Sequence, residues 1–202
     1  MYKVRALRLA LTDLWEELLL VVVTGVLGAL LGALLLPLPF VVATHYHLAR
    51  RVSRRRVVSW RELPALARSN LRFFALWTAL VVLVSLVLMG NIFFYLSIGA
   101  VWSQMAAWVM VGLLFTWLVP QPFVPALYLQ APEQSVRSAL RRAAVFVTMD
   151  PLAPLTLLLA VALPAVPLAY YAWPLLGILL PFMALVVTRM VQLRTESDDM
   201  KR

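Results

Sequence analysis

The sequence predicts an all-α protein, a polytopic transmembrane helix bundle with five long spans and a short or re-entrant helix near residues 37–49. Composition is the first observation behind this fold class. Of 202 residues, 63% are apolar and 13% are charged, and the mean hydropathy is +0.90. Soluble domains are about half apolar and about a quarter charged. The other two observations are long tracts without charge and arginines that gather between those tracts.

The charge-free tracts set the number of spans. Residues 18–49, 73–132 and 151–188, which are 32, 60 and 38 residues long, contain no Asp, Glu, Lys or Arg. A spanning helix needs about 20 apolar residues, so the second and third tracts hold two helices each, and the first holds more than one. We expect spans at 18–36, 73–95, 101–129, 152–170 and 174–191. Pro174 suits the first position of a helix, and Asp150 before Pro151 is expected to cap the helix that follows.

The basic residues predict the orientation. Eight arginines and a single acid, Glu62, lie between residues 50 and 72, a net charge of +7. Cytoplasmic loops carry such an excess, so we place this loop, the 133–150 loop and the C-terminus in the cytoplasm. The loops near 91–100 and 170–173 are uncharged and rich in Tyr and Trp, as expected of an aromatic belt at the outer face.

Two topologies stay open for the N-terminal part. Lys3, Arg5 and Arg8 favour a cytoplasmic N-terminus, since the positive-inside rule gives acids little weight. The segment 38–49 must then return as a short or re-entrant leg, because about 12 residues cover only about 18 Å of a core about 30 Å thick. The alternative is an external N-terminus, five spans, and residues 37–49 on the inner surface. Internal similarities disagree: residues 37–43 resemble 120–126, whereas 5–10 resemble 138–143.

The expected organisation is one transmembrane domain, residues 1–193, with the cytoplasmic basic loop 50–72, and a short charged cytoplasmic tail, residues 194–202. Pro120, Pro122 and Pro125 mark either a packed kink or the wall of a polar cavity, because proline frees a backbone carbonyl that must be satisfied inside the protein. Gly25, Gly28 and Gly32 give the first span a small-residue face for helix packing, within the bundle or in a homo-oligomer.

The basic loop is the candidate docking surface. Polybasic segments beside a membrane attract anionic headgroups, and they also suit an acidic cytoplasmic partner such as a transporter subunit. The residues assigned to partner or anionic-lipid docking are Arg50, Arg51, Arg54, Arg55, Arg56 and Arg61. Ser59 and Glu62 are expected to form a capping box after this cluster. A nucleic-acid partner is not expected, because no recognition fold accompanies the patch.

The chain offers few residues for catalysis or metal binding. The chain has no cysteine and two histidines. His45 and His47 lie about 200° apart on a helix and cannot share a ligand, so we expect them at the membrane interface. All nine acids lie outside the charge-free tracts, which disfavours a proton-coupled carrier, and no acid–base pair or nucleophile set can be named. We therefore predict no enzyme, no metal and no cofactor.

Mild polar residues remain within the tracts. Asn91, Gln104 and Gln121 are the candidate lining of a neutral-solute path broken at residues 120–125. Such side chains more often form hydrogen bonds between helices.

Several short motifs carry a resemblance to a known family. They include Ala6-Leu7-Arg8-Leu9-Ala10, the run Leu48-Ala49-Arg50-Arg51, Ser59-Trp60-Arg61-Glu62-Leu63 and Asn70-Leu71-Arg72-Phe73-Phe74. In this layout the chain resembles the YesL-like family of bacterial polytopic membrane proteins, although Val57-Val58 stands where that family tends to have a Gly-Glu turn. The resemblance implies a bacterial plasma-membrane protein of unassigned biochemical function, associated with carbohydrate uptake, and carries over no catalytic residue.

The functional expectation is a non-enzymatic accessory or scaffold for a solute uptake system, with the basic loop as its docking surface. The alternative is a small permease or substrate-binding subunit for a neutral solute. A membrane enzyme that acts on lipid ranks third.

Overall fold

The computed structural model describes residues 2–17, 38–54, 62–131, 135–171 and 178–199, and every element in these ranges is a helix. The helices are α1 (Tyr2–Glu16), α3 (Leu38–Ser53), α4 (Leu63–Arg68), α5 (Leu71–Ile98), α6 (Val101–Leu118), α7 (Phe123–Gln130), α8 (Val136–Met149), α9 (Leu152–Tyr171) and α10 (Leu179–Asp199). The all-α prediction is confirmed for these ranges.

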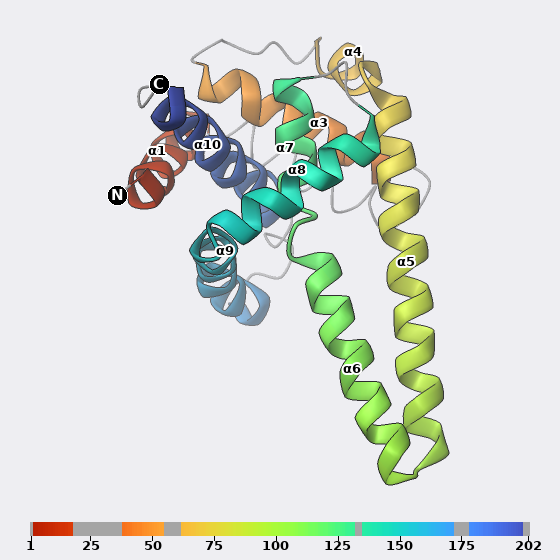
Figure 1. The fold of residues 1–202 in the computed structure, drawn as a ribbon. Helices are drawn as coiled ribbons and strands as arrows, with labels where there is room; N and C mark the ends of the chain where they lie inside the picture. Colours follow the sequence, from red (N-terminus) through yellow and green to blue (C-terminus); the bar gives the residue numbers. More distant parts are fainter. Residues whose placement is uncertain (1, 18–37, 55–61, 132–134, 172–177, 200–202) are drawn as a thin grey trace.

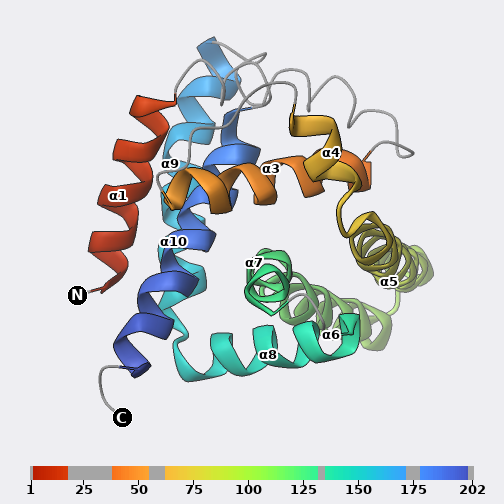
Figure 2. The same cartoon turned by 90° about the horizontal axis from the view of Figure 1, so that it is seen from above.

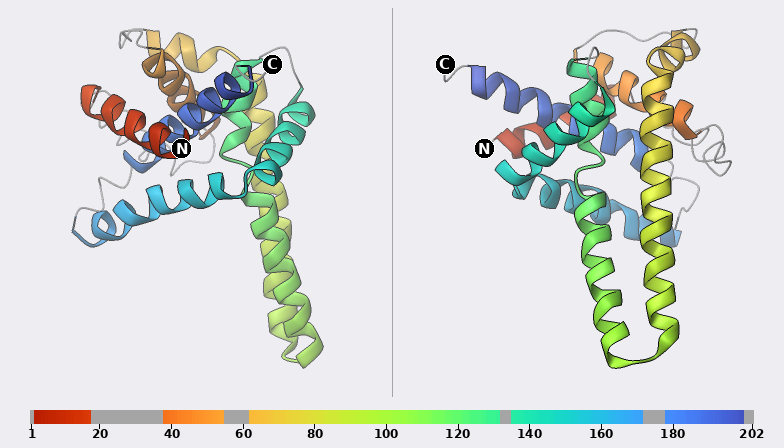
Figure 3. Two further views of the ribbon diagram at one scale, coloured as in Figure 1. Left: turned by 60° about the vertical axis from the view of Figure 1, so that its left-hand side comes forward. Right: turned by 45° about the vertical axis from the view of Figure 1, so that its right-hand side comes forward.

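Two parts of the molecule differ in shape. An antiparallel pair, α5 and α6, projects from a cluster formed by the other helices (Figure 1). We call residues 79–118 the hairpin, and α1, α3, α4, α7, α8 and α10 with residues 71–78 of α5 the head. Both termini lie in the head, away from the tip of the hairpin, in every view (Figures 1 and 3).

The hairpin is apolar on all sides. Residues 79–118 include no charged residue, and large side chains are exposed along this length: Leu86 is 62% exposed, Phe93 66% and Trp108 73%. A helix that is hydrophobic all round belongs inside a large core or a membrane. The turn at the tip needs Gly99, whose φ of 74° is a left-handed conformation that side chains disfavour. Tyr95 and Trp102 pack edge to face beside this turn, as expected at a membrane boundary.

The head holds the core. Seen from above, α7 is surrounded by α3, α10, α8 and the base of α5 (Figure 2). Residues 123–129 of α7 are all buried, and Tyr46, Phe74 and Met190 from three other helices are at most 2% exposed. Phe73 stacks on the Tyr128 ring at a centroid distance of 3.4 Å. Asn70 takes a left-handed φ of 61° before α5, a conformation that Asn tolerates better than most residues, and its Oδ1 accepts from the Tyr128 hydroxyl at 3.3 Å.

Within the described residues, fewer spans are found than the five predicted for the chain. Leu71–Ile98 and Val101–Gln130 are long and apolar enough to cross a membrane, and α8 with the first part of α9, bent by 93°, makes up to three if the pair is one span. The predicted span 18–36 and its glycines Gly25, Gly28 and Gly32 lie outside the described residues.

The last predicted span overlaps α10, but this helix ends later than predicted. The prediction was 174–191, whereas α10 runs from Leu179 to Asp199 and carries Arg189 and Arg194. It packs in the head against α1 and α3 (Figure 2). The helix also contains most of the expected tail 194–202, so this segment is helical up to Asp199. The expected tail contains Arg194, whose ion pair with Asp150 is one of the contacts that hold the end of α10 in the head.

The predicted short helix is confirmed as α3, which begins at Leu38 and extends to Ser53. Pro120, Pro122 and Pro125 were expected either at a packed kink or in the wall of a polar cavity, and the structure shows a packed kink. α6 ends at Leu118, residues 119–122 form a turn, and α7 continues into the core from Phe123. Gln121 is buried in this turn and accepts a hydrogen bond from Trp77 Nε1 at 3.0 Å.

Candidate functional site

The candidate docking arginines start at the C-terminal end of α3. Arg50 and Arg51 occupy its last turn, where cations complement the helix dipole. Arg51 forms an ion pair with Glu62, and the capping box between Ser59 and Glu62 stays a prediction. Arg54 is exposed just beyond the helix. Arg55, Arg56, Ser59 and Arg61 lie outside the described residues.

Arg50 and Arg54 line a hollow formed by three helices. They lie four residues apart, so they face the same side of α3. Gln130 of α7 and Thr188 and Gln192 of α10 complete its polar lining, and the hollow encloses about 250 Å³ including its open mouth. Sequence analysis missed the α7 and α10 contributions, because no local motif marks them. We call this feature the Arg50–Thr188 hollow.

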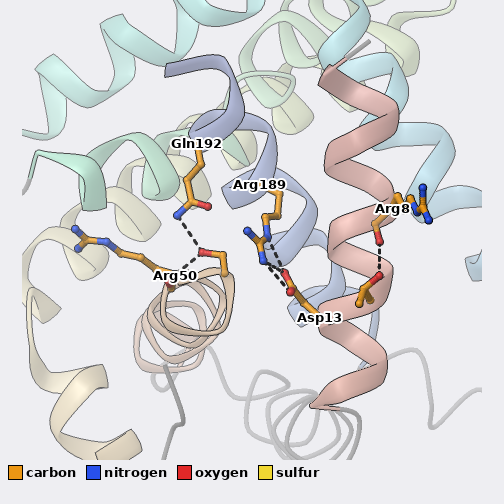
Figure 4. Close-up of polar contacts among 7 residues, drawn as sticks. Arg8, Asp13, Arg50, Arg189 and Gln192 are labelled. Carbon is orange, nitrogen blue, oxygen red and sulfur yellow. Dashed lines mark hydrogen bonds and ion pairs between the residues drawn. The ribbon is translucent and has the colours of Figure 1, made fainter. Parts of the chain in front are cut away.

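A hydrogen-bond chain fixes the wall of this hollow. Gln192 Nε2 donates to Ser53 Oγ at 3.0 Å, and Ser53 Oγ donates to the Arg50 carbonyl at 2.9 Å (Figure 4). The end of α3 is thereby tied to α10. This contact fixes α3 relative to α10, and with them the side chains at the mouth of the hollow.

The hollow is electropositive. Two of its described lining residues are arginines and none is acidic. Burial, followed by repulsion from Arg54, holds the pKa of Arg50 below its usual value. Both effects disfavour the positive charge of Arg50. An anion in the hollow would relieve the repulsion.

A buried ion pair lies beside the hollow and joins the first helix to the last. Arg189 donates from Nε to Asp13 Oδ2 at 2.6 Å and from Nη2 to Asp13 Oδ1 at 2.8 Å (Figure 4). The Asp13 and Arg189 side chains are 7% and 12% exposed. This bidentate geometry is specific to Arg. The sequence shows both charges, but not that residues 176 positions apart would meet.

Asp150 forms a second ionic cluster at the bend between α8 and α9. Its carboxylate accepts from the Tyr2 hydroxyl and pairs with Lys3 at 2.5 Å and Arg194 at 3.4 Å. Burial raises the Asp150 pKa, but the bonds from Lys3 and Tyr2 and the two positive charges outweigh it, so the pKa lies below its ordinary value. The predicted capping role is therefore wrong: the carboxylate is committed to α1 and α10.

Burial and the Asp150 carboxylate raise the pKa of Tyr2 to about 12. The phenol therefore stays a neutral hydrogen-bond donor at physiological pH. The Arg194 guanidinium also lies 5.9 Å from the Tyr2 ring centroid, within the range of a cation–π contact.

The two histidines are buried, which corrects the expectation that they lie at the membrane interface. His45 is 2% exposed and His47 7%. His45 Nδ1 lies 2.7 Å from the Val41 carbonyl, and His47 Nε2 lies 3.2 Å from Ser69 Oγ. Burial, together with the charges of Arg50 and Arg51, lowers the pKa of His47 to about 4 despite its bond to Ser69. Within the described residues, no group of three or more His, Cys, Asp or Glu is placed to hold a metal ion.

The three predicted path residues do not meet. Gln121 is buried at the base of the hairpin, where its Nε2 also donates to the Trp117 carbonyl at 2.9 Å. Asn91 lies farther along α5 and donates to the Val87 carbonyl of its own helix at 2.8 Å. Gln104 is exposed near the tip. A path lined by all three is therefore not formed.

Three further polar residues of the tracts bond to the preceding turn of the chain, whereas the buried Ser85 Oγ has no partner among the described residues. Ser103, Thr116 and Thr156 donate to carbonyls three or four residues earlier, at 2.7–2.9 Å. The expectation of hydrogen bonds between helices is wrong for these residues, because a short hydroxyl reaches the preceding turn more easily than a neighbouring helix.

Comparison with known proteins gives no match, whether to protein-family models, to curated proteins or to solved structures. The resemblance to the YesL-like family stays a prediction, and the assignment of the chain rests on its own geometry: helices able to cross a membrane, joined to a head that carries the arginines.

Proposed function

We propose that this protein is a non-enzymatic integral protein of the bacterial plasma membrane that acts as an accessory or scaffold subunit of a solute uptake system. Carbohydrate is the solute class implied by the YesL-like resemblance. The hairpin anchors the chain in the bilayer, and the head presents arginines to a cytoplasmic partner.

A single observation carries the proposal: the charged residues lie outside the hairpin, which exposes apolar side chains along its length. Leu86, Phe93 and Trp108 represent the outward apolar surface of the hairpin, which has no charged residue. The described arginines all belong to the head, at positions 5, 8, 50, 51, 54, 68, 72, 137, 141, 142, 189 and 194. Arginine excess marks the cytoplasmic side of membrane proteins, so we place the head and both termini in the cytoplasm and the hairpin tip outside.

The orientation can be tested by labelling, since the native chain has no cysteine. Single variants Arg54→Cys, Arg141→Cys and Ser97→Cys would be treated in intact cells with a membrane-impermeant thiol reagent. We expect Ser97→Cys to be labelled from outside and the other two only after the cells are opened. Labelling of Arg54→Cys in intact cells would overturn the orientation.

The docking role calls for a binding experiment. The chain would be purified in mild detergent from its native host, and every co-purifying protein identified by mass spectrometry. We expect a stoichiometric transporter subunit that is lost in Arg54→Gln/Arg55→Gln/Arg56→Gln. The matched control is Arg137→Gln/Arg141→Gln/Arg142→Gln, which removes the same charge from α8. A triple variant of the basic loop that inserts correctly and keeps the partner would overturn the docking role.

A further inference from the structure

We propose that the Arg50–Thr188 hollow is a binding site for a phosphate group, carried by an anionic phospholipid headgroup or by free phosphate. The inference goes beyond the scaffold role and does not depend on it. The residues that would hold the group are Arg50 and Arg54 of the α3 end and Thr188 of α10.

The charge of the hollow selects an anion. Arg50 and Arg54 face the same side of α3, and neither is joined to an acid by an ion pair among the described residues. Their neighbours Arg51 and Arg189 are neutralised by Glu62 and Asp13. Arginine offers forked N–H donors that match phosphate oxygens. The two arginines at the hollow are therefore the ones that keep donors for a ligand.

An unsatisfied hydroxyl points to a ligand independently of the charge. Thr188 lines the hollow and is only 6% exposed, and within the described chain its Oγ1 has no hydrogen-bond partner. Most other described threonines bond to their own helix backbone, as Thr195 does to the Val191 carbonyl at 2.9 Å, and Thr78 is the other buried threonine without a partner. A buried hydroxyl without a partner is costly. A phosphate oxygen at the hollow would accept a hydrogen bond from the Thr188 hydroxyl.

The remaining lining suits a phosphate of limited size. Gln130 and Gln192 add amide groups, and the Gln192 side chain is already oriented by its bond to Ser53. The enclosed part of the hollow has room for about one water molecule, so a phosphate group would bind at its open mouth, where the two arginine side chains lie.

The test uses the full chain purified in detergent. Inorganic phosphate binding would be followed by ³¹P nuclear magnetic resonance, and lipid retention by native mass spectrometry after addition of phosphatidylglycerol or phosphatidylcholine. Binding of free phosphate identifies the free anion, whereas retention of phosphatidylglycerol alone identifies the lipid. Either result supports the site, and the absence of both overturns it.

Three variants separate a built site from diffuse attraction. Arg50→Gln/Arg54→Gln should weaken binding more than tenfold. Thr188→Val keeps the shape but removes the hydroxyl, and should weaken binding about tenfold, since a hydrogen bond to a charged group is lost. Arg137→Gln/Arg141→Gln removes equal charge from α8 and should change affinity less than twofold.

Stability supplies the second readout. Thr188→Val buries one polar group fewer, so the unliganded variant should unfold at the same temperature as the native chain or higher. Weaker phosphate binding in a variant that is no less stable is not expected of a merely structural residue. Native-like affinity in Thr188→Val, or an equal loss in the α8 control, would overturn the proposal.

Discussion

The hairpin and the head differ in where their polar groups find hydrogen-bond and ion-pair partners. In the hairpin, charged residues are absent and mild polar groups such as Asn91 and Thr116 bond to their own helix. In the head, charges enter the protein and meet partners from distant segments, as Asp13 and Arg189 do. The hairpin is therefore stable only in a medium that accepts apolar surface, whereas the head depends on long-range contacts within the chain.

The buried ion pair should give the largest effect. Asp13→Asn leaves Arg189 buried without its counter-charge, and breaking such a pair by removing one partner costs about 3–5 kcal/mol. We expect this loss in the free energy of unfolding in detergent. The double variant Asp13→Leu/Arg189→Met should recover most of it, because apolar replacement of a buried pair is often neutral. A single variant as stable as the native chain would show that the pair does not hold α1 on α10.

A charge placed in the hairpin should weaken insertion of the chain into the membrane. Leu86 lies near the middle of the exposed stretch of α5, and Leu86→Lys is expected to cost about 2.5–3.5 kcal/mol on the insertion scale. The fraction of chain resistant to alkaline extraction from membranes should fall sharply. Leu11→Lys, at a 49% exposed position of α1 in the head, is the matched control and should insert normally. Equal extraction of both variants would remove the distinction between the two parts.

Acidification should weaken the head. The His47 pKa of about 4 lies below the ordinary 6.5, so the unfolded chain takes up the proton first. The contribution of His47 to stability is complete above about pH 6.5 and is lost as the pH falls toward 4, by at most about 3 kcal/mol. Unfolding temperatures between pH 7 and 4 should fall less in His47→Gln. Identical pH profiles would contradict the assignment.

The junction between the two parts should show the smallest effect. Gln121→Leu leaves the buried Trp77 indole N–H without its acceptor, an expected loss of about 1–2 kcal/mol. Gln104→Leu, at an exposed position on α6, should change stability by less than about 0.5 kcal/mol. Solute flux measured in liposomes would check the permease alternative at the same time. A specific flux abolished by both variants would restore the path that the geometry does not support.

Local pattern explains which parts of the fold are predictable. The α5–α6 pair, the short α3 and the break at Pro120 and Pro122 follow from tracts without charge, from Gly99 and from proline, each of which acts over a few residues. The end of α10 was missed because the charges near it, Arg194 among them, were predicted to form a tail, whereas the helix continues to Asp199. Only their contact with residues on other helices makes that helix compatible with the head.

Only some residues of the candidate site could likewise be predicted from local sequence. Arg50 and Arg54 were found from composition, since a cluster of arginines is visible in any reading of the chain. Thr188, Gln192 and Gln130 have no distinguishing signal, because a single Thr or Gln in an apolar segment is ordinary. Residue type and local order were enough to predict helices that could span a membrane and the division of charge. The tertiary structure decided the partners of Asp13 and Asp150, the burial of His45 and His47 and the lining of the Arg50–Thr188 hollow, because these depend on contacts between segments far apart in the chain.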